Sequence, residues 1–569
     1  MLKLAHFNTA LLAFPLLCFG ANSEAPAGSA QAQQTSISKA GNDTVNKDAG
    51  GKDAGNKDAG SSDVGSIVVI SHPIFDESDP DAFFIHRWAN FLHINTKEST
   101  VKNLLSFKEG DAITQKDLDE AQRLLRAEPY LRDATIKFAK RDPEADETGE
   151  HKDVVVETWD NWSLLPTVSA SRNGGDTKYS FGLKEDNLLG TGIRTRLKYQ
   201  SSQDRTGYKV AFDVPLTIVP HGTFAADFYD NSDGQASHVF FERPFYTLDG
   251  KLMYSAEALD DTRIDTLRQN GMEVNEFEHS TEFVNLRYGW LGNKTSEHLW
   301  RWVVGITKDS NSFESTGLYP DAELPQDRDF LYPWLGWQFI EDDYRVLNNV
   351  HLINYNEDFN LGWQHYLRFG VETQDTDGDI PGWHVATESS KGFESGDSLL
   401  LLWLKGQGTF NTTQKDNFQL SGIAEYFYQI NPKWTAYGKA VVGTSNNTYV
   451  DTTLALGDET GLRGYPNDYQ HGDHQWLLSA EIRNYPNINL YQLAELGWAA
   501  FIDVGQAFGG PEAERNEVSG PIGSIGIGAR IYSSRSSYGN VAHIDLTVPF
   551  SSGEHVDNWE WRFLVKDRF

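Results

Sequence analysis

Residues 163–569 are dominated by short runs in which apolar and polar residues alternate, separated by clusters of Gly, Asn, Asp and Pro. Clear examples lie at Thr195–Tyr199, Phe224–Tyr229 and Trp300–Gly305. Alternation with a period of two is typical of β-strands that present different side chains to their two faces. Apolar residues at helical spacing are not found in this part of the sequence. The pattern therefore predicts an all-β domain made of many short strands.

Residues 66–160 follow a different pattern and predict a small α/β domain. Apolar runs predict strands at Ser66–Ile70, Ala134–Ala139 and Asp153–Thr158. A short helix is expected over Val101–Phe107, because Gly110 follows it closely as a helix terminator.

A second helix is predicted after Thr114, which stands three residues before Asp117 in the pattern of a capping box. Apolar residues then follow at helical spacing, at Leu118, Ala121, Leu124 and Leu125. The expected order of elements in this domain is β-α-α-β-β.

The N-terminal residues 1–23 have the pattern of a secretory signal peptide. Lys3 supplies the positive start, residues 10–19 the apolar core, and Ala21-Asn22-Ser23 a cleavage site of small residues. A membrane anchor is the alternative, but the apolar run is too short to span a bilayer as a helix. Residues 24–65 contain Lys-Asp-Ala-Gly three times and no apolar periodicity, so we expect a flexible tether.

Composition narrows the class of protein. Cys18 is the only cysteine, so the mature chain would contain no disulfide. The mean hydropathy is −0.50 and no later apolar run is long enough for a membrane helix. A membrane β-barrel remains possible, because its alternating strands average out to polar. A soluble sandwich or propeller is the alternative, but the secretory signal and the many Trp and Tyr residues favour the membrane barrel.

The formal net charge of −32 argues against nucleic acid as a partner, because phosphate binding needs clustered Lys and Arg. The acidic residues are scattered in small groups, for example at Glu357-Asp358 and Asp375–Asp379. We interpret them as parts of solvated outer loops.

The last run of the sequence alternates most clearly. Trp559, Trp561, Phe563 and Val565 lie on one face, and the sequence ends at Phe569. One face of such a strand would meet lipid, and the other the lumen or a neighbour. A terminal aromatic strand resembles the signal by which bacterial outer-membrane barrels are recognised for assembly, although Lys566 and Asp567 depart from that pattern.

Two short motifs are candidates for a functional contact. Arg463-Gly464-Tyr465 lies in a loop-like stretch, and Phe501-x-Asp503-x-Gly505 lies on a strand two elements later. A guanidinium inside a barrel loses hydration and needs a hydrogen-bonded carboxylate. Asp503 is the first candidate partner and Glu481 the second. The alternative is an exposed Arg463 and a solvated lumen aspartate.

The small domain resembles a POTRA domain, a periplasmic module of outer-membrane assembly proteins. The resemblance rests on the element order, on Phe107–Asp111 before the second helix and on Pro129–Ala134 after it. The stretch 73–97 is longer than the usual first loop of such a domain.

The chain as a whole resembles the BamA-like superfamily, in which POTRA domains precede a 16-stranded outer-membrane barrel. There, an Arg-Gly-aromatic triplet lies in the sixth outer loop, between strands 11 and 12, and the loop folds into the barrel. Five alternating runs follow Tyr465 here, as sixteen strands require; Phe501, Asp503 and Gly505 would then lie on strand 13. The runs are 474–486, 493–508, 521–533, 539–550 and 557–569. Residues Glu185–Gly192 resemble the early barrel hairpin of the family.

The predicted fold is thus a membrane all-β protein, a 16-stranded antiparallel barrel over 163–569 with a POTRA-like domain over 66–160. The resemblance implies insertion or translocation of client proteins at the bacterial outer membrane, without a chemical reaction. A first strand near Leu164–Arg172 would pair weakly with the last strand, 557–569, and leave a seam for clients. A passive channel or surface antigen and a dedicated exporter of one secreted partner are the alternatives.

The partners implied are outer-membrane lipids and lipopolysaccharide, unfolded outer-membrane or secreted clients, and periplasmic chaperones as further candidates. Signatures of hydrolases, zinc proteases and nucleotide-binding loops are not found, so we expect neither catalysis nor a cofactor. His471-Gly-Asp473-His474 could supply metal ligands, and Asp76, Asp79 and Asp81 could be taken for calcium ligands. We interpret both groups as ordinary loop residues, because neither has the spacing of a known site.

Overall fold

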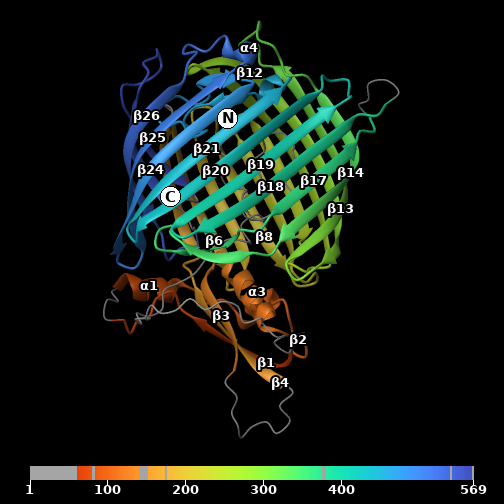
Figure 1. Ribbon diagram of the computed structural model, residues 1–569, viewed down its shortest axis with the longest axis vertical. Helices are drawn as coiled ribbons and strands as arrows, with labels where there is room; N and C mark the ends of the chain where they lie inside the picture. The colour runs from red at the N-terminus through yellow and green to blue at the C-terminus, as the bar shows by residue number, and fades with distance from the viewer. Residues whose placement is uncertain are drawn as a thin grey trace.

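The computed structural model describes residues 61–79, 84–139, 151–173, 176–374, 380–537 and 541–566. The predicted signal peptide, almost all of the predicted tether, Asp81 and Phe569 lie outside these residues. A small α/β domain stands at one end of a large β-barrel (Figure 1). Among the described residues, no helix is long and apolar enough to cross a membrane.

The small domain is a four-stranded sheet with strand order β2-β1-β4-β3, in which β1 and β4 run parallel. Helices α2 and α3 pack on it through buried apolar side chains that include Val101, Leu118 and Leu125. Its elements are β1 (Ser62–His72), α1 (Phe84–Leu92), α2 (Glu98–Leu104), β2 (Ala112–Ile113), α3 (Gln115–Arg126), β3 (Leu131–Phe138) and β4 (His151–Asp160).

Three features of this domain test the sequence patterns. The capping box at the start of α3 is confirmed: the Thr114 side chain accepts a hydrogen bond from the Asp117 N–H, and the Asp117 carboxylate accepts one from the Thr114 N–H. Strand β1 begins at Ser62, inside the predicted tether, because Val64 is buried in the domain core. Helix α1 was not predicted and occupies the long first loop noted in the sequence.

Twenty strands of the described chain close into the barrel, and each pairs antiparallel with its neighbours, with β28 adjacent to β5. They are β5 (Leu164–Asn173), β6 (Asp176–Leu188), β7 (Ile193–Ser201), β8 (Thr206–Leu216), β9 (Gly222–Asn231), β10 (Gly234–Arg243), β11 (Leu252–Gln269), β12 (Met272–Lys294), β13 (His298–Ser315), β14 (Arg328–Glu341), β17 (Gln364–Val371), β18 (Trp383–Ser395), β19 (Ser398–Phe410), β20 (Asn417–Asn431), β21 (Trp434–Asn446), β24 (His474–Leu490), β25 (Ala494–Phe508), β26 (Ile522–Tyr532), β27 (Val541–Pro549) and β28 (Glu560–Lys566).

The predicted count of sixteen strands is therefore wrong for the described chain. The five strands expected after Tyr465 are present as β24 to β28, but fifteen strands precede that residue instead of eleven. Asp503 consequently lies on the seventeenth strand of the wall and not on a thirteenth. Only the strands that follow the Arg463 loop were counted in the sequence. Alternation alone does not give the number of strands that precede that loop.

The two faces of the wall differ in chemistry. On β12, Val284, Leu286 and Tyr288 are exposed on the outside, whereas Asn285 and Arg287 between them are buried toward the lumen. The last strand follows the same rule, with Trp561 exposed and Arg562 buried. The barrel is thus apolar outside and polar inside, the reverse of a soluble β-protein.

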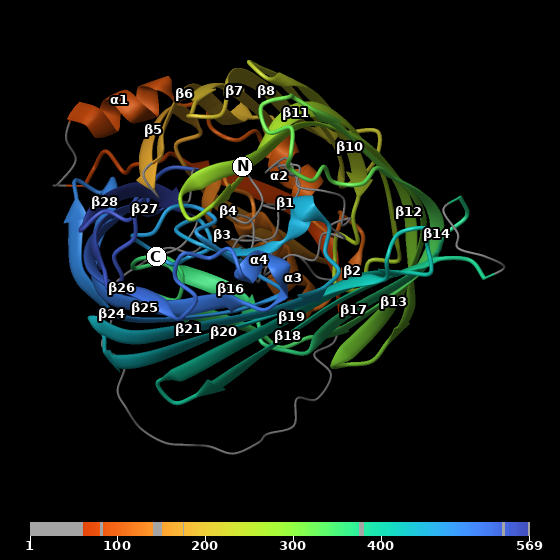
Figure 2. The same ribbon diagram turned by 90° about the horizontal axis from the view of Figure 1, so that it is seen from above.

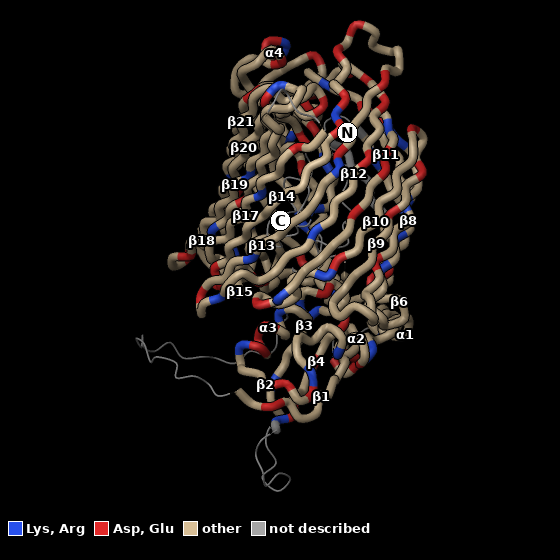
Figure 3. Tube along the Cα trace, turned by 90° about the vertical axis from the view of Figure 1, so that its right-hand side faces the viewer, with Lys and Arg blue, Asp and Glu red and all other residues tan. Residues whose placement is uncertain are grey.

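Many loops at the end opposite the small domain carry Asp and Glu (Figure 3). The interpretation as solvated outer loops is wrong for Glu357 and Asp358, whose side chains are 10% and 15% exposed in the segment between β14 and β17. Asp375–Asp379 lie outside the described residues.

Two segments fold into the lumen, one from each end. The inner hairpin, residues 342–363, joins β14 to β17 and contains β15 (Tyr344–Asn348) and β16 (Asn356–Asn360), which lies within the barrel outline in Figure 2. The inner loop, residues 447–473, joins β21 to β24 and carries the Arg463 motif. It contains η2 (Val450–Thr452), β22 (Leu454–Leu456) and β23 (Gln470–Gly472), and a short helix α4 (Gly510–Ala513) lies in the next loop on the same side.

Candidate functional site: a buried ion-pair network in the lumen

Arg463 is the centre of a buried network. Its Nε and Nη2 atoms donate hydrogen bonds to Asp503 Oδ2 at 2.6 Å and Oδ1 at 2.8 Å, which is a bidentate pair. Its Nη1 atom lies 2.9 Å from Glu481 Oε1. Both carboxylates named as candidate partners therefore contact the same guanidinium, and all three side chains are buried.

The other motif residues on β25 shape the space around that guanidinium. Phe501, Asp503 and Gly505 alternate along the strand and so share its inner face. The Arg463 guanidinium carbon lies 3.4 Å from the centre of the Phe501 ring, a close cation–π contact. A Cβ atom at Gly505 would lie 2.7 Å from the Trp476 carbonyl oxygen, so only glycine fits there.

Gly464 and Tyr465 fix the turn of the inner loop. Gly464 has φ of +87°, and a Cβ atom there would lie 2.9 Å from the Thr547 methyl group on β27. Tyr465 is fully buried, and its hydroxyl donates a hydrogen bond to the Gly523 carbonyl oxygen at 2.9 Å. The triplet thus binds the loop to the inner faces of β25, β26 and β27.

The network continues from Glu481 toward the small domain. Arg483 Nε donates to Glu481 Oε2 at 2.8 Å, and Arg483 Nη1 donates to the Val350 carbonyl oxygen in the inner hairpin at 3.4 Å. In the hairpin, the Glu357 carboxylate accepts hydrogen bonds from the backbone N–H groups of residues 350–352. Asp358 next to it accepts two hydrogen bonds from Arg126 of helix α3, at 3.0 and 3.1 Å.

Further contacts join α3 to the base of the inner hairpin. Lys116 lies 2.5 Å from Asp342, and the Arg123 guanidinium stacks 4.2 Å from the centre of the Tyr344 ring. A chain of polar contacts therefore runs from the small domain through the inner hairpin to the inner loop.

The inner loop also contacts both sides of the β28–β5 seam. Asp458 forms an ion pair with Arg562 of β28 at 3.2 Å, and Glu459 forms one with Lys178 of β6 at 2.6 Å. The described residues pair β28 with β5 at a single position, Phe563 with Arg172. The adjacent strands β27 and β28 pair at seven consecutive positions, from Val541–Lys566 to Thr547–Glu560. Two neighbouring acids of the inner loop thus contact β28 on one side of the seam and β6, the strand next to β5, on the other.

The sequence did not identify these seam contacts. Arg562 belongs to the alternating last strand, whose pattern did not show which face is inward, and Asp458 and Glu459 belong to no motif. A second buried pair, between Arg530 Nη1 on β26 and Asp545 Oδ1 on β27, at 2.5 Å, was missed as well. The available signal was an inward charge on a barrel strand, which needs a partner when it is buried.

Comparison with known proteins gives the following matches. No protein-family model and no curated protein sequence matches this chain. Among solved structures, it is similar to CdiB from Acinetobacter baumannii at 12% identity, with 89% of this chain and 74% of that chain covered and a TM-score of 0.45. BamA from Haemophilus ducreyi lacking POTRA domains 1–3 matches at 11% identity, 88% and 84% coverage and a TM-score of 0.41. The FrpB iron transporter from Neisseria meningitidis matches at 10% identity, with 78% of this chain and 88% of that chain covered and a TM-score of 0.39.

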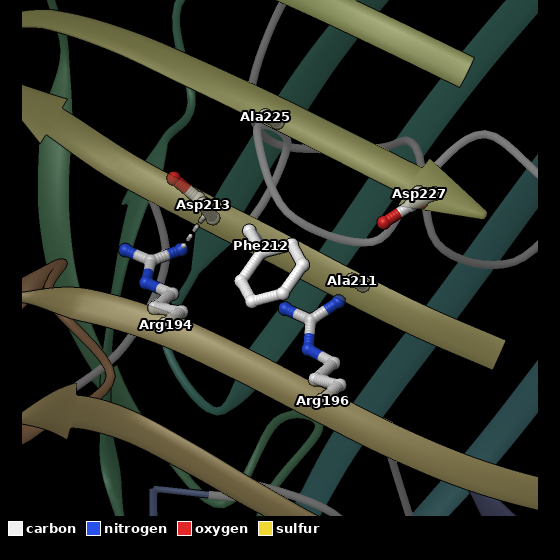
Figure 4. A pocket seen from close by; sticks show the side chains of 7 residues that line it. All are labelled: Arg194, Arg196, Ala211, Phe212, Asp213, Ala225 and Asp227. Atoms are coloured by element: carbon white, nitrogen blue, oxygen red, sulfur yellow. Dashed lines mark hydrogen bonds and ion pairs between the residues drawn. The ribbon is translucent and has the colours of Figure 1, made fainter. Parts of the chain in front are cut away.

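A second group of charges joins the small domain to the wall near the start of the barrel. Arg194 on β7 lies between Asp213 of β8, at 3.3 Å, and Glu128 of the small domain, at 3.0 Å. Figure 4 shows Arg194 and Arg196 beside Asp213 and Asp227 along the rim of a small cavity. Burial raises the pKa of Glu128, while the positive charge of Arg194 opposes that rise.

The residues considered as metal ligands have other contacts. His471 Nε2 lies 2.7 Å from the Arg268 carbonyl oxygen, and His474 Nδ1 lies 2.8 Å from the Thr444 hydroxyl. Asp76 accepts hydrogen bonds from the backbone and the side chain of Ser78 in a local turn. In the described ranges, no group of three or more His, Cys, Asp or Glu side chains is arranged to hold a metal ion.

The seam contacts lead to a graded prediction. The Arg562 and Asp458 side chains are 3% and 0% exposed, so Arg562→Ala leaves a buried carboxylate without its cation and is expected to cost about 3–5 kcal/mol. The Lys178 side chain is 30% exposed, so Lys178→Ala is expected to cost less than about 1 kcal/mol. The temperature at which the folded form converts to the unfolded one in gel electrophoresis measures both. Equal effects of the two substitutions would contradict the assignment of Arg562 as the main contact.

Proposed function

We propose that this chain is a bacterial outer-membrane barrel that inserts or translocates client proteins without chemical catalysis. The observation that carries the proposal is the inner loop, which Arg463 holds through Asp503 and Glu481 beside the weakly paired β28–β5 seam. A seam that the described residues pair at one position leaves backbone N–H and C=O groups on both edge strands. Those groups can pair with an unfolded client strand while it enters the bilayer.

The apolar outer face of the wall supports a location in a bilayer, with lipids and lipopolysaccharide of the outer membrane around it. Residues 66–160 would then stand in the periplasm as a POTRA-like domain. Strand β3 is an edge strand of the sheet and gives that domain a place where a client strand could add to it. Clients would be unfolded outer-membrane or secreted proteins, delivered by periplasmic chaperones.

The alternative of a passive channel is less well supported. The inner hairpin and the inner loop fill the lumen from opposite ends, and each is bonded to the wall by buried polar side chains. A dedicated exporter remains the second member of the proposed class, and the identity of the client distinguishes it from a general insertase.

The proposal predicts that the protein accelerates client folding. The purified chain is reconstituted in liposomes, an unfolded outer-membrane barrel is added, and its conversion to a protease-resistant form is timed against empty liposomes. Acceleration is expected. The same rate with and without the protein, together with steady ion conductance, would overturn the insertase and favour the channel.

A further inference from the structure

Helix α1 presents a large apolar face whose side chains remain well exposed in the described part of the structure. Phe84 is 66% exposed, Trp88 57%, Phe91 84% and Leu92 43%. These positions follow the spacing i, i+4, i+7 and i+8, so they lie on one side of the helix. Four large apolar side chains exposed together on nine residues indicate a surface that contacts something apolar.

The opposite face of α1 is fixed to the barrel rim. Ala89 packs with Ile74 and Phe75 against Trp162 and Leu493 of the barrel end. His86 is buried, stacks on Phe75, and its Nε2 atom lies 2.8 Å from the Tyr491 carbonyl oxygen.

The helix is therefore bound to the turn between β24 and β25 and to Trp162, two residues before β5. The apolar face points away from that contact. The contacts of Ala89 and His86 combine apolar packing with a hydrogen bond, and they hold the helix in a fixed position at the barrel rim.

The position of α1 relative to the wall identifies what it faces. The helix lies at the end of the barrel where the small domain stands (Figure 1), and at the outer edge of the outline beside β5 and β6 when the barrel is viewed along its axis (Figure 2). The outer surface of the wall is also apolar at this end, where Leu164, Ile488, Leu490 and Tyr491 are exposed. The apolar face of α1 thus continues the apolar outer surface of the barrel.

We propose that α1 is a membrane-interfacial helix, which buries Phe84, Trp88, Phe91 and Leu92 in the periplasmic leaflet of the bilayer around the barrel. A short helix with aromatic residues on one face and polar residues on the other lies in the plane of the interface between headgroups and acyl chains. Arg87 is exposed beside Trp88 and is placed to contact lipid phosphates.

The inference rests on the proposed location of the barrel in a membrane, but not on the handling of clients. Its consequence concerns the position of the small domain relative to the membrane. A helix bound to the rim next to β5 and embedded in lipid holds the small domain close to the membrane surface beside the seam.

The test uses fluorescent probes on cysteines introduced one at a time into the mature chain, whose predicted form contains no other cysteine. Phe91→Cys and Trp88→Cys report on α1, and both side chains are exposed enough to be replaced without loss of packing. Ile527→Cys on β26, 62% exposed, reports on the outer wall. Lys137→Cys on β3, with a side chain 63% exposed, reports on the aqueous side of the small domain.

Each labelled protein is reconstituted in vesicles of phosphatidylethanolamine and phosphatidylglycerol. Probes at 88 and 91 are expected to emit at shorter wavelength than the probe at 137. Their quenching by nitroxide-labelled lipid is expected to exceed that of the probe at 137 several-fold, while aqueous iodide quenches them less.

The outcomes separate the possible explanations. Iodide quenching at 88 and 91 equal to that at 137, with lipid quenching at 527, would overturn the interfacial helix and leave the membrane barrel standing. Protection of 88 and 91 from both quenchers would overturn it in favour of a protein contact. Absence of lipid quenching at 527 as well would overturn the membrane location on which the inference depends.

Discussion

Replacing Arg463 by alanine is expected to remove much of the heat resistance of the barrel and to abolish acceleration of client folding. The substitution takes the guanidinium from Asp503 and Glu481 together, and Asp503 is fully buried. Breaking a buried pair by removing one partner costs about 3–5 kcal/mol, because the remaining charge has no compensation. The inner loop would also lose its contact with Phe501, so its hold on β25 would fail.

The matched control is Arg515→Ala. Arg515 also lies in a loop and pairs with an acid, Glu512, but its side chain is 67% exposed. Exposed pairs of this kind contribute about 0–1 kcal/mol, so the control should keep its heat resistance and its activity. Arg463→Lys should fall between the two, because an ammonium group cannot reproduce the bidentate pair with Asp503. Client folding and heat resistance in Arg463→Ala equal to those of Arg515→Ala would refute the role of the inner loop.

The contact between Arg463 and Asp503 could be predicted because both residues stand in short motifs whose chemistry requires a partner. Arg463 stands beside a glycine in a loop, and Asp503 stands between Phe501 and Gly505 on one face of a strand. Both the residue types and their spacing indicate a buried ion pair. The alternating strands and the capping box of α3 were accessible for a similar reason. Each rests on residues close together in the sequence, where periodicity and local hydrogen bonding decide the structure.

The inner hairpin illustrates what local pattern does not contain. Residues 344–360 have the alternation and the Asn-rich turns of an ordinary barrel hairpin, and Asn349 and Asn354 adopt positive φ as in such turns. Only its partners place it inside the lumen, where Leu352 and Tyr355 pack with Tyr532 of β26. Those partners are far apart in the sequence, so neither the hairpin nor the true number of wall strands could be read from periodicity.

The seam contacts were missed for the same reason, although the alternation of the last strand was recognised. Alternation places Arg562 on the face opposite Trp561, but it does not show which of many acids it meets. Its partner, Asp458, lies in the inner loop about a hundred positions earlier in the sequence. Pairing of buried charges depends on how the loop folds back, and that is a property of the closed barrel.

Replacing residues 344–360 by a short Gly-Ser link is expected to convert the protein into an open pore. Barrels of 16–18 strands leave an aqueous channel and those of about 22 strands carry a plug, so a wall of twenty strands needs filling to stay closed. The inner hairpin supplies that filling. Its side chains pack on the inner faces of β19, β20 and β21 in one cluster, and on β24 to β27 in another.

Steady single-channel currents in planar bilayers are the measurement, with the unaltered chain expected to be nearly silent. Asp358→Ala gives an intermediate case, because it releases the hairpin from Arg126 of helix α3 without removing it. Brief openings are expected there, since the hairpin keeps its apolar packing and its contacts with Lys116 and Arg123 but loses its buried ion pair with the small domain. A folded, heat-resistant link variant that conducts no more than the unaltered chain would show that the inner loop alone closes the lumen. The link variant could also conduct ions and still accelerate client folding. Activity would then not depend on a closed lumen, which would place the client pathway along the seam.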